Sequence, residues 1–101
     1  SILEPTDGEN ISDCSMVHVH ADATAEVDHQ LHDVEIELSL VDNDSTIFES
    51  ENHTHEQNFS FEQDFDLCTY GSGTCFELEI EVYKDHDGSE SESKSITFCL
   101  N

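Results

Sequence analysis

The chain has 101 residues and a formal net charge of −23, from 25 acidic and 2 basic residues. This charge excludes nucleic acids and anionic membrane surfaces as direct partners, and it favours cations or basic proteins. The length allows one domain, residues 1–101, with a modest core, and the 35% of hydrophobic residues lie in periodic runs that indicate a folded chain. No apolar run is long enough for direct membrane insertion.

Strict alternation of apolar and polar residues, the period of a half-buried β-strand, recurs along the chain. The clearest alternating runs are residues 17–24, 34–40, 59–61, 76–82 and 95–100. Two short segments, residues 2–3 and 46–48, are expected as edge strands. Turn-forming residues separate these segments at positions 5–8, 42–44, 71–73 and 87–88. The pattern predicts an all-β fold, an antiparallel β-sandwich of about seven strands.

The order of these segments carries a resemblance that covers nearly the whole chain. Its parts are Ile2-Leu3-Glu4-Pro5-Thr6-Asp7-Gly8, Val34-Glu35-Ile36-Glu37-Leu38, Phe59-x-Phe61, Phe76-Glu77-Leu78-Glu79-Ile80-Glu81-Val82, Asp85-x-Asp87-Gly88 and Ser95-Ile96-Thr97-Phe98. In this order they resemble a bacterial immunoglobulin-like domain, and the His-x-His before the phenylalanine-rich strand is loosely similar to uncharacterised immunoglobulin-like domains of exported Bacteroidetes lipoproteins. The resemblance implies an immunoglobulin-like sandwich in a cell-surface or periplasmic module without catalysis. The chain has no Trp, so the core of antibody domains is not expected.

Five of the seven histidines fall in loops that an immunoglobulin-like strand order brings to one end of the sandwich. They are His29 and His32 after the second strand, His53 and His55 after the fourth, and His86 after the sixth. Acidic residues accompany them at Asp28, Asp33, Asp85 and Asp87. Three or four of these ligands can close a tetrahedral Zn²⁺ site or a Cu²⁺ site, and the alternative is a set of solvated loop side chains. Residues 85–90 also resemble a Ca²⁺-binding loop, with a simple tight turn as the alternative.

The remaining His-x-His pair, His18 and His20, lies within an alternating run, so both side chains are expected on the outer face of one strand. They can hold one metal ion between them, with an acid from a neighbouring strand, or they belong to a solvated sheet face. A second outer face is expected to be strongly acidic, because two neighbouring strands carry glutamates at alternate positions. These are Glu35, Glu37, Glu77, Glu79 and Glu81.

The four cysteines have no CxxC spacing, which favours two disulfides over a zinc ribbon and places the chain outside the cytoplasm: secreted, periplasmic or at the cell surface. All four are expected near the end of the sandwich opposite the loop histidines. The most economical pairing joins Cys68 to Cys75 and Cys14 to Cys99. The other two connectivities remain open.

Two functions follow from these patterns. The first is an exported, noncatalytic immunoglobulin-like module that binds Zn²⁺ or Cu²⁺ through its loop histidines. The second is an adhesion, spacer or protein-interaction module, whose partner is another surface protein or the rest of a longer chain. An enzyme is disfavoured, because no nucleophile elbow or other catalytic motif is present.

Overall fold

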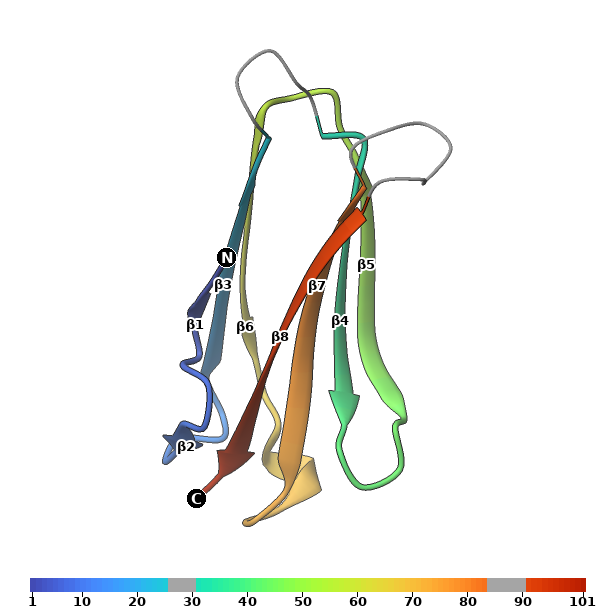
Figure 1. The fold of residues 1–101 in the computed structure, drawn as a ribbon. Coiled ribbons are helices and arrows are strands. Elements are labelled where there is room, and N and C mark those ends of the chain that lie inside the picture. The colour runs from blue at the N-terminus through green and yellow to red at the C-terminus, as the bar shows by residue number, and fades with distance from the viewer. Residues whose placement is uncertain (26–30, 84–90) are drawn as a thin grey trace.

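A computed structural model describes residues 1–25, 31–83 and 91–101. Within these ranges the chain forms one short 3₁₀ helix, η1 (Cys68–Tyr70), and eight strands. The strands are β1 (Ile2–Glu4), β2 (Asn10–Ile11), β3 (Val17–Thr24), β4 (Asp33–Leu40), β5 (Thr46–His53), β6 (Asn58–Phe65), β7 (Cys75–Tyr83) and β8 (Ser91–Leu100). They build a three-stranded sheet of order β1-β3-β6 and a five-stranded sheet of order β2-β8-β7-β4-β5, which face each other as two layers (Figure 1). The expected all-β sandwich is confirmed, and the immunoglobulin-like relationship stays a prediction.

The first strand of the sandwich is divided between the two sheets. β1 pairs antiparallel with β3, whereas β2 pairs parallel with β8, the one parallel pairing among the described strands. The turn residues between β1 and β2 attach to β8, because Asp7 Oδ1 accepts a hydrogen bond from Thr97 N at 2.9 Å and Gly8 N donates to Thr97 O at 2.7 Å. Gly8 has a φ of 82°, a backbone conformation that favours glycine.

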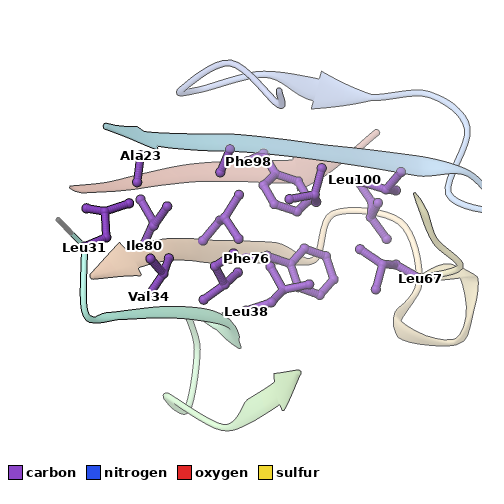
Figure 2. Packing of buried hydrophobic residues seen from close by; sticks show 14 of the residues in the cluster. Ala23, Leu31, Val34, Leu38, Leu67, Phe76, Ile80, Phe98 and Leu100 are labelled. Atoms are coloured by element: carbon purple, nitrogen blue, oxygen red, sulfur yellow. The ribbon is translucent and has the colours of Figure 1, made fainter. Parts of the chain in front are cut away.

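The core lies between the layers and follows the predicted alternation. Every second residue of β3, from Val17 to Ala23, is buried, and the same holds for β7 from Phe76 to Ile80. Side chains from both sheets meet along the length of the sandwich, and Phe76 stacks on Phe98 with ring centres 5.3 Å apart (Figure 2). Burying one such large apolar side chain stabilises the fold by roughly 1.5–3 kcal/mol.

Three strands are longer than the sequence predicts. β8 begins at Ser91 instead of residue 95, because residues 91–94 pair with residues 80–83 of β7. β5 extends to His53, well beyond the expected segment 46–48, and β6 covers Asn58–Phe65 instead of residues 59–61. Both are edge strands with many exposed polar residues, so hydrogen bonding to β4 and β3 extends them where their own hydrophobic pattern is weak. The turn expected at residues 87–88 lies outside the described residues.

The two disulfides join Cys14 to Cys68 and Cys75 to Cys99, so the economical pairing was wrong. Cys75 and Cys99 are direct cross-strand partners in β7 and β8, with Cα atoms 4.0 Å apart. Cys14 precedes β3 and Cys68 follows its partner β6, where Leu67 N donates to Cys14 O at 2.8 Å. Strand pairing, and not closeness in sequence, therefore decides the connectivity.

Both disulfides point to an oxidising, extracytoplasmic environment. In the part of the chain that the structure describes, no helix has the length and apolar character needed to cross a membrane.

Candidate functional site

Three of the predicted loop histidines come together at one end of the sandwich, called the histidine pole here and defined by His32, His53 and His55. His32 precedes β4, His53 ends β5, and His55 lies in the β5–β6 connection, which passes from one sheet to the other at the upper end of Figure 1. The ring centres of His53 and His55 are 4.8 Å apart, and those of His32 and His55 are 5.7 Å apart. Residues far apart in the sequence therefore present adjacent imidazoles.

Backbone hydrogen bonds hold this arrangement. His32 N donates to Tyr83 O at 2.9 Å, and Thr54 N donates to His32 O at 3.0 Å, so His32 is tied to the end of β7 and to the segment after β5. Asp33 faces His53 across β4 and β5, and its Oδ1 lies 3.0 Å from His53 Nδ1. A carboxylate in this position fixes the orientation of an imidazole ring.

The other predicted ligands at this end, His29, His86, Asp28, Asp85 and Asp87, lie outside the described residues, as does the Ca²⁺-loop prediction for residues 85–90. Across residues 1–25, 31–83 and 91–101, no group of three or more His, Cys, Asp or Glu side chains is arranged so that it could hold a metal ion. Metal binding at the histidine pole therefore stays a prediction.

His18 and His20 lie on the outer face of the three-stranded sheet, as the alternation predicts, with ring centres 6.4 Å apart. His18 Nδ1 lies 2.6 Å from Asp64 Oδ1, and its Nε2 lies 2.9 Å from Glu62 Oε1 and 3.9 Å from Glu4 Oε2. The hydrogen bond to Asp64 raises the pKa of His18 above its ordinary value of 6.5, and the charges of the surrounding carboxylates add to the rise. We call these four residues the His18 cluster.

His20 has weaker polar contacts. Its Nε2 lies 3.4 Å from both Asp22 Oδ1 and Ser60 Oγ. The sequence predicts an acid beside the histidine pair but does not name it. The alternating acids of β6, Glu62 and Asp64, are the signal that identifies it once β6 is paired with β3.

The outer face of the five-stranded sheet carries the predicted glutamates and two more from β5. Glu35 faces Glu51 and Glu81, and Glu37 faces Glu49 and Glu79. We call this set, with Glu77, the acidic face. Partial burial and neighbouring glutamates raise the pKa of Glu35 and of Glu79 above the ordinary 4.5, and a hydrogen bond with Glu81 contributes to raising the pKa of Tyr83 to about 12.

Comparison with known proteins finds no matching family model, no similar curated protein and no similar solved structure.

Proposed function

We propose that this chain is an exported, noncatalytic immunoglobulin-like module that binds Zn²⁺ or Cu²⁺ through the histidine pole. The observation that carries the proposal is the spacing of the three rings. Two imidazoles on one tetrahedral zinc ion have ring centres about 5 Å apart, because each Zn–N bond is about 2.0–2.1 Å long. The separations of 4.8 and 5.7 Å lie on either side of that value.

The electrostatics of the chain support the same conclusion. A net charge of −23 raises the local concentration of cations around the molecule. Asp33, at 3.0 Å from His53 Nδ1, supplies the carboxylate that commonly orients a metal-bound histidine. Imidazole is the side chain best matched to Zn²⁺ and Cu²⁺ among those gathered at this end.

Further ligands are proposed from the strand order. The β3–β4 and β7–β8 connections start and finish at the same end of the sandwich as the β5–β6 connection. His29 and His86, which the sequence also predicts as ligands, belong to those two connections and lie outside the described residues.

The test is calorimetric titration of the metal-free protein with Zn²⁺ and with Cu²⁺ in physiological salt. We expect submicromolar, stoichiometric binding to be lost in the His32→Ala/His53→Ala/His55→Ala variant. Thr46→Ala is the control, because Thr46 is exposed at the opposite end of β5 from His53, so this variant is expected to bind metal as the unchanged protein does. Equal binding by the triple variant and the unchanged protein would refute the proposal.

The acidic face favours the second candidate, an adhesion, spacer or protein-interaction module. Its glutamates oppose one another across neighbouring strands, which is costly unless counterions or a basic partner neutralise them. Weak, salt-sensitive metal binding that the triple histidine variant leaves unchanged would favour this candidate over the first.

A further inference from the structure

β6 is the outermost strand of the three-stranded sheet, and one of its long edges has no partner strand within the described ranges. In an antiparallel pair, successive residues direct their backbone N–H and C=O groups alternately toward the partner strand and away from it. Ala25 N donates to Gln57 O at 2.8 Å, so the odd-numbered residues of β6 face β3. The backbone groups of the even-numbered residues, from Asn58 to Asp64, therefore point away from β3 along the open edge.

The inner face of the same strand offers apolar contacts beside this edge. Phe59, Phe61 and Phe65 pack against the core, but each of them is only partly buried. Phe48, from the edge strand β5 of the other sheet, has its ring centre 6.0 Å from that of Phe61 and 4.9 Å from that of Phe65. A strand added beside β6 would bury its inward-facing side chains against these rings.

The outer face beside the edge is acidic. The side chains of Glu62 and Asp64 are 57% and 54% exposed, and Asp66, just beyond the end of β6, is exposed as well. Glu62 and Asp64 contact His18 together with Glu4. Three carboxylates outweigh one imidazolium, so this group of side chains stays negative even when His18 is protonated.

The charge decides which strand suits the open edge. A second copy of this chain is disfavoured, because it would bring its own β6, with Glu62 and Asp64, or its own acidic β5 against the same carboxylates. Like charges opposite each other across a sheet are destabilising, and charged edge strands are a common protection against self-pairing. A strand that carries basic side chains is instead attracted by these carboxylates.

We propose that the open edge of β6 binds, as an added strand, an extended segment of a partner protein in which lysine or arginine alternates with apolar residues. Directly opposed residues of neighbouring strands share one face of the sheet, so the basic side chains lie opposite Glu62 and Asp64 and the apolar ones opposite Phe61. In this mode of recognition, main-chain hydrogen bonds supply affinity and alternate side chains supply specificity. This binding does not depend on metal at the histidine pole.

The edge strand of the other sheet fits such a segment less well. Ser50 and Asn52 of β5 lie opposite the buried residues Ile36 and Val34, so β5 turns polar side chains inward where β6 has phenylalanines. Asn52 Nδ2 donates a hydrogen bond to Ser50 Oγ at 3.0 Å. β5 therefore offers acidic side chains without the apolar contacts, and its variants serve as a comparison for those of β6.

The test uses a peptide with blocked ends and the length of β6, eight residues, in which lysine and valine alternate. It is titrated into the whole ¹⁵N-labelled protein in the presence of a chelator, and amide hydrogen exchange is followed by NMR. We expect saturating peptide to slow the exchange of the Ser60 and Glu62 amides by about tenfold, because they gain acceptors. The Phe61 amide, which faces β3, is expected to change by less than about twofold. A peptide with the same residues in two blocks is expected to bind about fivefold more weakly, because it cannot place its bases on one face.

Ser60→Pro removes one outward N–H and leaves the hydrogen bonds to β3 in place, and proline is tolerated where the N–H of an edge strand faces solvent. We expect it to weaken peptide binding by about tenfold with an unchanged circular dichroism spectrum. If this variant does not fold, the exchange rates and the charge variants still decide.

Glu62→Gln/Asp64→Asn is expected to weaken peptide binding by about fivefold, through the loss of two cross-strand charge pairs. Glu49→Gln/Glu51→Gln removes the same charge from β5 and is expected to weaken binding by less than about twofold. Equal losses in the two charge variants would overturn the proposal, because they indicate general attraction between a basic peptide and an acidic protein. Unprotected Ser60 and Glu62 amides at saturating peptide would overturn it as well.

Discussion

Glu79 is a single residue that shows how the acidic face opposes folding. Its neighbours are Glu77 and Glu81 in the same strand and Glu37 across the strand pair. Partial burial, followed by these like charges, raises the pKa of its carboxyl. A carboxyl whose pKa is higher in the folded state than in the unfolded state binds protons on folding. The stability that the folded state gains from binding this proton is complete at a pH below 4.5, the ordinary pKa of a glutamate. It is lost as the pH rises through the higher pKa of the folded state.

Replacing Glu79 with Gln therefore stabilises the protein at neutral pH. We expect the free energy of unfolding to rise by about 0.2–1 kcal/mol, the size of a cross-strand pair effect. Urea denaturation at neutral pH and again near pH 4.5 measures it, with the gain shrinking at the lower pH. Glu56→Gln, outside the acidic face, is the control, and an equal gain in that variant would contradict the explanation.

Among the elements, the disulfides fix pairs of strands within each sheet. Cys75–Cys99 joins β7 to β8 and closes 24 residues, while Cys14–Cys68 joins the segments flanking β3 and β6 and closes 54. Loop-closure entropy gives a stabilisation of about 3.5 kcal/mol for the shorter loop and about 4 kcal/mol for the longer one.

We expect the double variants Cys75→Ser/Cys99→Ser and Cys14→Ser/Cys68→Ser each to lose roughly this free energy of unfolding in urea. Proteolysis without reductant, followed by mass spectrometry, checks the connectivity itself. Linked peptides that join Cys68 to Cys75 would contradict the structure.

The elements also show what can be predicted from the sequence. β3, β4, β7 and residues 95–100 of β8 were predicted closely, because residues buried on one face alternate with exposed ones. The exposed, polar first residues of β8, 91–94, were missed. β5 and β6 were underestimated, since edge strands depend on their partners' hydrogen bonds more than on their own apolar residues. Predicting the disulfide pairing requires the register between strands, and hydrophobic periodicity does not give that register.

The same limit applies to the candidate sites. Outward placement of His18 and His20 follows from the period of two, and the gathering of His32, His53 and His55 follows from the strand order. Which carboxylates meet those histidines depends on register across strands that are distant in the sequence, and this information comes from the fold.

For the whole molecule, the net charge of −23 dominates the dependence on salt. Self-repulsion opposes the compact state, and added salt screens it over a Debye length of about 8–10 Å near physiological ionic strength. We expect the unfolding midpoint to rise from low salt to 0.15 M NaCl, by about 4–8 °C for each kcal/mol gained in a domain of this size. Differential scanning calorimetry measures it, and a flat or falling midpoint would show that repulsion does not limit stability.

X-ray absorption at the zinc edge is the most direct test of transition-metal binding by the histidines at the pole. The one-to-one zinc complex of the His18→Ala variant confines the metal to the pole. We expect at least two imidazole ligands with Zn–N distances of about 2.0–2.1 Å. A spectrum that shows only oxygen ligands would contradict it.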